Sequence, residues 1–231
     1  MTGDSALAEL RDSHHRIEAD RWEDIYVVGD VHGCLSALER LVDRIDPDDD
    51  TLLVVVGDLI RKGPDSHGVV EFVRERDTVV SVRGNNEAKI VRGDKEVPGL
   101  TGEDRAYIES LPHAISWDGN LVVHGGVDPR KSLGDHDPAE LLTMRSLTPD
   151  GSYDRPFWFE EYADSPRVFF GHTVLAEPYE SAGAVGLDTG CVYGGELTAY
   201  HVGSGEFLTV EPEETYQERS SDSIVTPRMP N

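Results

Sequence analysis

The apolar residues of this chain form short β-branched runs that alternate, over its first half, with segments of helical periodicity. Runs at 25–28, 51–56 and 78–82 are strand-like, and after the first of them apolar residues recur at helical spacing over 35–45. A second helix is expected after Asp65 or Ser66, either of which can cap its first turn. This alternation predicts successive β-turn-α units.

The pattern changes from residue 120 onward, where strand-like runs follow one another with fewer helices between them. They lie at about 120–124, 167–171, 184–188, 196–202 and 206–211, and Gly194 with Gly195 is interpreted as a hairpin turn. A further helix is expected near 103–111. The whole pattern predicts an α/β (α+β) fold in which a two-sheet β-sandwich is flanked by helices.

Composition divides the chain into three stretches. Residues 1–23 form a polar N-terminal lead-in, residues 24–211 a single domain, and residues 212–231 a polar, Pro-containing tail that we expect to be disordered. His14 and His15 lie in the lead-in, outside the strand-end pattern. We interpret them as residues of a solvent-exposed helix and not as metal ligands.

The formal net charge of −24, from 45 acidic and 21 basic residues among 231, limits what the chain can bind. At ordinary salt such a surface repels nucleic acid and acidic membranes, so neither is an expected partner. The acids are spread along the chain and are not clustered. We therefore favour a salt-adapted (halophilic) cytoplasmic protein over one whose acidity serves a cationic partner.

Cysteine content and hydropathy bear on the compartment. Cys34 and Cys191 are far apart in sequence and belong to no C-x-x-C pair, so we expect free, buried thiols. No apolar run approaches the roughly 18 residues of a membrane span, and the N-terminal MTGDSALAEL lacks the pattern of a signal peptide. These features predict a soluble, cytoplasmic protein and leave its oligomeric state open.

The strand-like runs end at side chains that can bind metal ions. In chain order these are Asp30, His32, Asp58, Asn85, His124 and His172. Ligands in open α/β sheets gather at the carboxyl ends of the strands, so these side chains are expected to line one crevice. Any one alone is equally well a turn residue or a hydrogen-bonded histidine, but burying all of them together is costly without a cation. The sequence therefore predicts a dinuclear metal site at the C-terminal strand ends.

The types and spacing of these ligands indicate how two divalent ions would be shared. Asp58 is the expected bridge, because the two oxygens of a carboxylate can face two ions about 3.5–4 Å apart. Asp30 and His32 are two residues apart on an extended segment and can hold one ion together. The other ion then falls to Asn85, His124 and His172. This donor set favours Mn²⁺, with Fe, Co²⁺ or Zn²⁺ as alternatives, over Ca²⁺.

The segments GDVHG, GDLIRKGP, GNNE, HGG and GHT, in this order, resemble the successive motifs of the calcineurin-like metallophosphoesterases. The phosphoprotein phosphatase and symmetrical diadenosine tetraphosphatase branch is the most similar. The resemblance extends over roughly residues 25–200 and includes GLDTGCVYGGELTAY at 186–200. It implies a metallophosphoesterase-like sandwich with the metals at one edge of the sheets, and it places the metal ligands of the family on the six positions named above.

Two of these motifs depart from the family pattern. Protein phosphatases have GDxxDRG and GNHE, in which the Asp and His support protonation of the leaving group and the Arg grips phosphate. The corresponding residues here are Arg61, Asn86 and Lys62. Asn86 cannot act as a general acid, and Lys62 offers a point charge in place of a bidentate fork. Because a phosphate leaves as a stabilised anion and a serine alkoxide does not, these changes favour phosphoanhydride substrates.

The expected reaction is in-line attack on phosphorus by a hydroxide that bridges the two metals. Charge on the phosphoryl oxygens would be met by Asn85, Lys62 and Arg145, which together with Asp58 are the expected catalytic residues. Arg145 is equally interpretable as a surface residue. The expected substrate contacts are Arg61, Lys62, Asn86 and Arg145.

We therefore predict a metal-dependent phosphohydrolase of phosphoanhydride or phosphomonoester bonds, with diadenosine tetraphosphate or a similar nucleotide as the favoured substrate. A protein serine/threonine phosphatase, acting on a phosphoprotein, is the first alternative. A catalytically weak metal- or nucleotide-binding regulatory module is the second. Asp188 is left open between orienting a ligand histidine and forming a turn.

Overall fold

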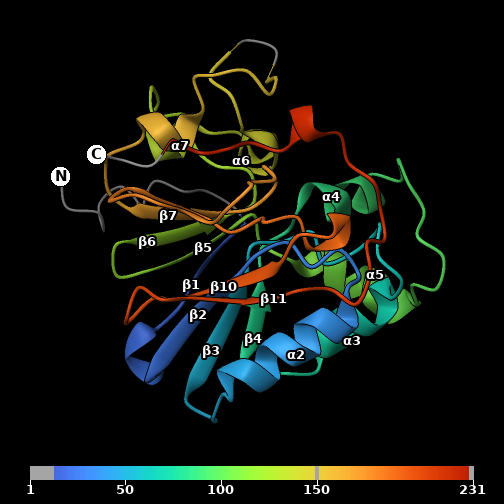
Figure 1. Ribbon diagram of the computed structural model, residues 1–231. Coiled ribbons are helices and arrows are strands. Elements are labelled where there is room, and N and C mark those ends of the chain that lie inside the picture. Colours follow the sequence, from blue (N-terminus) through green and yellow to red (C-terminus); the bar gives the residue numbers. More distant parts are fainter. Residues whose placement is uncertain (1–12, 149–150, 229–231) are drawn as a thin grey trace.

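The computed structural model describes residues 13–148 and 151–228, in which two β-sheets stack face to face between outer layers of helices (Figure 1). One sheet has five strands in the order β11-β10-β2-β3-β4. Their bounds are Phe207–Val210, Leu197–His201, Asp24–Val28, Thr51–Val55 and Val79–Ser81. The other sheet has six strands in the order β1-β5-β6-β7-β9-β8. Their bounds are His14–Arg16, Ala114–Trp117, Asn120–Val123, Arg167–Phe170, Ala184–Gly186 and Tyr179–Glu180. The predicted two-sheet sandwich with flanking helices is confirmed.

The first half of the chain builds the parallel part of the five-stranded sheet. β2, β3 and β4 pair in parallel in that order. Helices α2 (Leu35–Ile45) and α3 (Ser66–Arg74) connect them across the outer face of the sheet (Figure 1). As expected, Asp65 caps α3, because its carboxylate accepts the backbone N–H of Gly68 at 2.7 Å. The carboxyl ends of these three strands therefore lie at one edge of the sheet.

In the part of the chain that the structure describes, four further helices complete the outer layers. α4 (Asn85–Val91) and α5 (Gly102–Ser110) follow β4 and contact each other, and α5 also contacts α3. α6 (Pro138–Thr143) and α7 (Trp158–Glu161) lie over the outer face of the six-stranded sheet (Figure 1). Both sheets are thus covered on both faces.

The core has three layers, which explains why the strands read as continuous apolar runs. Between the sheets, Val54, Val122 and Phe169 are fully buried, whereas α7 contributes Trp158 and Phe159 to the core on the outer side of the six-stranded sheet. Fully burying one such aliphatic or aromatic side chain contributes roughly 1.5–3 kcal/mol before the entropy of ordering is counted. This rigid stack holds the loops at the strand ends in place.

Several short elements differ from the expectation. The paired histidines of the lead-in begin the edge strand β1, which pairs in parallel with β5, and are not part of a helix. Gly194 and Gly195 follow a single 3₁₀ turn (Cys191–Tyr193) where the chain crosses from one sheet to the other, so they do not form a hairpin. The hairpin lies after His201, between the antiparallel strands β10 and β11.

The C-terminal segment, residues 212–228, differs most from the prediction of a disordered tail. Tyr216 donates its backbone N–H to Val192 O at 3.1 Å, and Val225 donates to Val174 O at 2.8 Å. Val225 is buried and Tyr216 packs against the core, so two apolar side chains fix a segment whose average composition is polar. We call residues 212–228 the C-terminal strap.

Both cysteines are in the state that the sequence analysis predicts. Cys34 and Cys191 are free and buried. Within residues 13–148 and 151–228, no helix combines the length and apolar character that a membrane crossing requires.

Candidate metal centre

The loops after the strands bring the predicted carboxylate and imidazole ligands into one buried cluster. The ligand atoms of Asp30, His32 and Asp58 all lie within 4.8 Å of one another. His32 Nε2 is 3.8 Å from Asp30 Oδ2 and 3.5 Å from Asp58 Oδ2. His124, directly after β6 in the second sheet, places its Nε2 3.4 Å from Asp58 Oδ1. Asp58 therefore lies between the ligands of both sheets.

The remaining two predicted ligands lie at the same cluster. The backbone N–H of His172 donates to Asp30 Oδ1 at 3.2 Å, and its ring centroid is 5.2 Å from that of His124. Asn85 Oδ1 accepts from Asn86 Nδ2 at 3.0 Å. The structure thus brings all six predicted ligand positions together.

The backbone around the centre is strained in a way that aims the side chains inward. His32, Asp58 and His172 have positive φ values of 51°, 51° and 64°, which cost non-glycine residues about 1–3 kcal/mol each. Glycine is required beside two of the carboxylates. A Cβ on Gly171 would lie 1.9 Å from an Asp30 oxygen, and one on Gly84 would lie 2.2 Å from Asp58 Oδ1.

The histidine rings are oriented by their other nitrogens. His32 Nδ1 faces Ile60 O at 3.2 Å, and His124 Nδ1 faces Val56 O at 2.8 Å. If Nδ1–H donates to these carbonyls, the Nε2 lone pair points into the cluster, as metal-binding histidines require. Among the described residues, the buried His124 Nε2 has no hydrogen-bond partner. A buried imidazole nitrogen without a hydrogen bond, surrounded by carboxylates, fits bound metal ions.

Among the side chains of the cluster itself, carboxylates outnumber imidazoles that favour the charged form. Burial raises the pKa of Asp30 well above its ordinary value, and the neighbouring Asp188 carboxylate raises it further. Burial also works against the charged form of Asp58, but His124 and His32 outweigh it, so the pKa of Asp58 is well below its ordinary value. Burial by itself would lower the pKa of His124. The neighbouring carboxylates of Asp58 and Asp30 outweigh burial and raise this pKa to about 10. Three buried carboxylates beside one such imidazolium suit divalent cations, whose binding would displace its proton.

The predicted substrate contacts lie around this cluster. Lys62 Nζ is 2.6 Å from His32 Nε2, and Arg145 Nη2 is 2.8 Å from His172 Nε2. Arg145 is therefore directed at the centre and is not an ordinary surface residue. Arg61 Nη1 donates to Asn86 Oδ1, and Asn86 Nδ2 donates to Asp58 Oδ2.

Two acidic residues outside the predicted ligand set shape the centre. Glu87 lies in the first turn of α4, and its buried carboxylate accepts the backbone N–H groups of Asp58 and Ile60 at 2.9 and 3.2 Å. Burial raises the pKa of Glu87 to about 7, with Asp58 adding to the rise. Asp188 accepts the backbone N–H of Gly190 at 3.1 Å, and no hydrogen bond joins it to a histidine in the described part of the chain. Asp188 is thus a turn residue that adds negative charge.

Sequence reasoning missed two groups at the rim of the centre. The Tyr193 ring lies 6.5 Å from the His32 ring, and the Arg219 guanidinium lies over Tyr193 at 4.7 Å. Tyr193 lies within residues 186–200, which carry part of the family resemblance. That resemblance could have indicated Tyr193 as a residue near the centre. Arg219 lies in the C-terminal strap, where no sequence pattern marks it.

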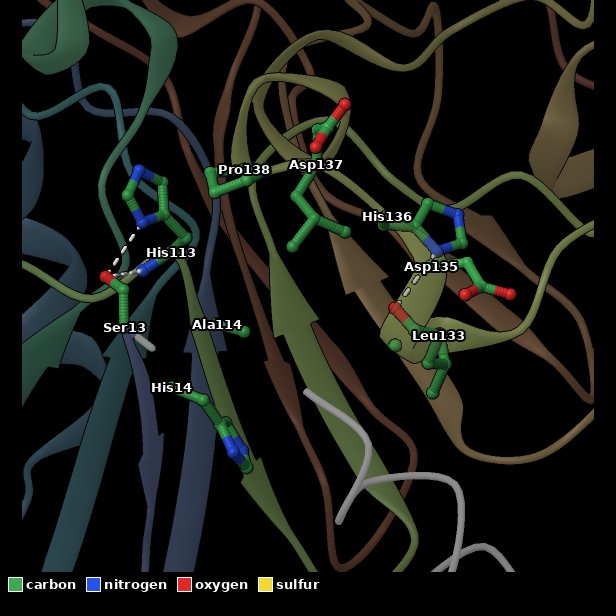
Figure 2. Close-up of a pocket in the computed structure, with 11 residues that line it drawn as sticks. Ser13, His14, His113, Ala114, Leu133, Asp135, His136, Asp137 and Pro138 are labelled. Carbon is green, nitrogen blue, oxygen red and sulfur yellow. Dashed lines mark hydrogen bonds between the residues drawn. The ribbon is translucent and has the colours of Figure 1, made fainter. Parts of the chain in front are cut away.

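A pocket of about 320 Å³ lies apart from the metal centre at the edge of the six-stranded sheet, between β1, β5 and the segment before α6 (Figure 2). It contains His14, His113 and His136. His113 Nδ1 pairs with Ser13 Oγ at 2.7 Å, and His136 Nδ1 faces Leu133 O at 3.2 Å. The three imidazoles are separated around the pocket and do not converge on one point, so they do not form a metal-binding cluster there.

A sandwich of two sheets that gathers carboxylates and imidazoles at its strand ends defines a metal-dependent phosphohydrolase. The chain belongs to the calcineurin-like phosphoesterase family, whose model matches residues 24–223. This family depends on a dinuclear metal centre.

Individual relatives cover most of the chain. A protein of Salmonella typhimurium named serine/threonine-protein phosphatase 1 is 32% identical over 80% of this chain and 94% of its own length. An asymmetrical bis(5'-nucleosyl)-tetraphosphatase of Halalkalibacterium halodurans is 30% identical over 80% of this chain and 92% of its own length. A crystal structure provisionally described as a diadenosine tetraphosphatase matches with a TM-score of 0.77 and 29% identity, covering 87% of this chain and 98% of that one.

Proposed function

We propose that this chain hydrolyses the phosphoanhydride bonds of a dinucleoside polyphosphate, such as diadenosine tetraphosphate, or of a similar nucleotide. The supporting observation is the contact set of Asn86, which stands where protein phosphatases have histidine. Its Nδ2 donates to Asp58 and its Oδ1 accepts from Arg61. An amide held in this way supplies no proton, so the leaving group must depart as a stable anion, as a phosphate does. The relatives named as bis(5'-nucleosyl)-tetraphosphatases agree with this chemistry.

The six predicted ligands would hold two divalent ions, which, when bound, lower the pKa of water and neutralise charge on phosphoryl oxygens. Lys62 and Arg145 orient the scissile phosphoryl group by donating to its non-bridging oxygens, a role for which their positions beside His32 and His172 suit them. As the bond from water oxygen to phosphorus forms and the water gives up a proton to solvent, the bridging P–O bond breaks. Arg61 then stabilises the departing phosphate by charge and hydrogen bonding, without proton transfer.

Mn²⁺ is the metal that we propose, because the centre combines carboxylate, imidazole and amide donors; Fe, Co²⁺ and Zn²⁺ use the same donor types. We also propose that the protein works in a salt-rich cytoplasm, which the net charge of −24 supports.

A protein serine/threonine phosphatase is the second candidate, and the Salmonella typhimurium relative named for that activity is the observation in its favour. It requires another source for the leaving-group proton. Glu87, whose pKa burial raises to about 7, is already engaged by backbone N–H groups and does not supply one.

A substrate panel tests the proposal. Purified protein is loaded with Mn²⁺ at high salt and given diadenosine tetraphosphate, p-nitrophenyl phosphate and a phosphoserine peptide, with Asp58→Asn as the background control. We expect turnover of the dinucleotide with kcat/KM at least about 100-fold above that of the peptide, which is the size of one lost general acid. The reverse order would establish the protein phosphatase, and binding of metal and nucleotide without turnover of any substrate would establish a regulatory module.

A further inference from the structure

Three cationic side chains and two tyrosine rings form a continuous arc along the rim of the metal centre. Lys62 Nζ lies 5.2 Å from the Tyr193 ring, and the Arg219 guanidinium lies 4.7 Å from the same ring. On its other side, Arg219 lies 5.7 Å from the Tyr153 ring, over which Arg145 also packs at 4.1 Å. We call these five residues the rim arc. Its two ends, Lys62 and Arg145, contact the predicted ligands His32 and His172.

Within the described residues, none of the three cations of the rim arc forms a salt bridge, although the Asp188 carboxylate acts on all of them at longer range. Elsewhere in the described residues, arginines such as Arg74, Arg130 and Arg155 pair with carboxylates within 4.0 Å, but none of the three rim cations does. This contrast is marked in a chain with 45 acidic and only 21 basic residues. Guanidinium and ammonium groups that face one crevice without a salt-bridge partner are suited to an anionic ligand.

Arg219 is held in place before any ligand arrives. Its Nε donates to Ser223 O at 3.0 Å and its Nη2 donates to Tyr153 Oη at 2.6 Å. The strap that carries it is itself tied to the centre, since Gln217 Nε2 donates to Lys62 O at 3.4 Å. These bonds leave Nη1 of Arg219 for a ligand and reduce the entropy that binding must overcome.

We propose that Arg219 is a specificity-determining residue that binds a phosphate lying beyond the scissile phosphoryl group in a polyphosphate chain. This inference rests on the proposed function, because it specifies the substrate of the same site. Lys62 and Arg145 contact the phosphoryl group at the metals, and Arg219, between the two tyrosines, meets the next part of the chain. A phosphomonoester does not extend that far, so Arg219 distinguishes polyphosphates from monoesters.

Binding of inorganic tripolyphosphate and orthophosphate to the metal-free protein, measured by calorimetry, tests this directly. We expect Arg219→Gln to weaken tripolyphosphate binding about 10-fold, as for the loss of one charge-assisted contact, and to leave orthophosphate binding nearly unchanged. Arg228→Gln is the matched control, because Arg228 is exposed on the same strap and should change neither affinity. In the metal-loaded enzyme, the same Arg219→Gln change should raise KM for diadenosine tetraphosphate with little effect on kcat and none on p-nitrophenyl phosphate.

Equal effects on the two inorganic anions, or no effect on either, would overturn the role of Arg219. Arg219→Lys keeps the positive charge but lacks the planar guanidinium group, so it should retain part of the tripolyphosphate affinity. This variant provides the test if Arg219→Gln does not fold. The two proposals fail separately. If the wild type turns over no dinucleotide but loses tripolyphosphate affinity on Arg219→Gln, only the proposed function is wrong. If it turns over dinucleotide and the variant behaves identically, only the rim arc is wrong.

Discussion

Asp58 is the residue on which most contacts of the centre converge. It receives the backbone N–H of Asn86 at 2.8 Å and faces imidazoles from both sheets. Asp58→Asn keeps an oxygen for the backbone bond but removes the charge that two cations would share. We expect metal content to fall and turnover to drop by about 10³-fold or more, while the metal-free protein stays folded. Elemental analysis, turnover and circular dichroism measure the three effects.

Asp128→Asn is the matched control for that substitution. Asp128 is also a buried aspartate after a strand of the sandwich, but it pairs with Arg130 at 2.7 Å and contacts none of the predicted ligands. We expect it to retain metal and activity. An Asp58→Asn enzyme with full activity and both metals would show that Asp58 does not bridge them.

The contact between Arg61 and Asn86 explains why the missing leaving-group acid cannot be restored by one substitution. Asn86→His alone places the new imidazole beside a guanidinium, which disfavours its protonated form. Arg61→Asp together with Asn86→His replaces the cation with a carboxylate that supports the proton. For the double variant we expect turnover of an alkyl phosphate to rise about 100-fold relative to p-nitrophenyl phosphate, whose leaving group needs little protonation.

The single variant Asn86→His serves as the control and should change that ratio only slightly. Steady-state kinetics on both esters give the answer. If the double variant shows an unchanged ratio, leaving-group protonation does not limit this enzyme, and the argument from Asn86 to phosphoanhydride substrates loses its basis.

At the scale of elements, α3 and α5 are joined through one buried carboxylate. Asp104, in the first turn of α5, accepts from Arg74 and His67 of α3 at 2.9 and 2.8 Å and from the backbone N–H of Thr101 at 2.8 Å. Asp104→Ala removes both cross-links and the bond from the Thr101 backbone N–H, and it leaves the Thr101 side chain as the N-cap of α5. We expect it to lower the free energy of unfolding by about 1–3 kcal/mol, measured by urea denaturation, while the neighbouring exposed Glu103→Ala changes it little.

The destabilisation should depend on pH in a defined direction. Burial opposes the charge of Asp104, but hydrogen bonds from Thr101 and His67 outweigh burial and lower the pKa of Asp104 below 3.8. The carboxylate therefore stabilises the fold at higher pH, and this stabilisation is lost as the pH falls through the lowered pKa. The hydrogen bond to Asp104 raises the pKa of His67 above 6.5. The stabilisation from protonated His67 is therefore lost as the pH rises through this raised pKa. The difference between wild type and variant should be largest between pH 3.8 and 6.5. A difference that is flat with pH would mean that capping alone, and not the charges, links the helices.

Elements with long apolar runs could be predicted from the sequence, whereas very short elements could not. The core buries strands β2, β3 and β7, so their sequences are continuous apolar runs that predict strands. The polar residues that end these runs stand out against them, which made the candidate ligands recognisable. β8 consists of two residues and β1 of three, too few to show a period, and their pairing with neighbours comes from tertiary context. Arg219 shows the same limit at the centre. It acts through a strap fixed by two apolar residues in a polar stretch, which composition alone describes as disorder.

At the scale of the whole molecule, the net charge of −24 is distributed over a surface with few cations to offset it. Exposed acids such as Asp49 and Asp50, in the loop before β3, make no salt bridge in the described part of the chain. Repulsion among such charges disfavours the compact state, and salt reduces it by shortening the screening length from about 10 Å at 0.1 M to about 3 Å at 1 M. Stability should therefore depend on salt through the surface and not through the core.

We expect the unfolding temperature of the metal-free protein to rise by roughly 4–8 °C between 0.1 and 1 M KCl, corresponding to about 2 kcal/mol, and then to level off. Differential scanning calorimetry measures it. The double variant Asp49→Asn, Asp50→Asn should be more stable than wild type at 0.1 M and equal to it at 1 M, because screening removes the repulsion that the substitutions remove. The contrary outcome is an unfolding temperature that rises linearly with KCl while the difference between variant and wild type stays the same. That result would indicate that salt strengthens the burial of apolar surface, and the acidic surface would then have no part in salt adaptation.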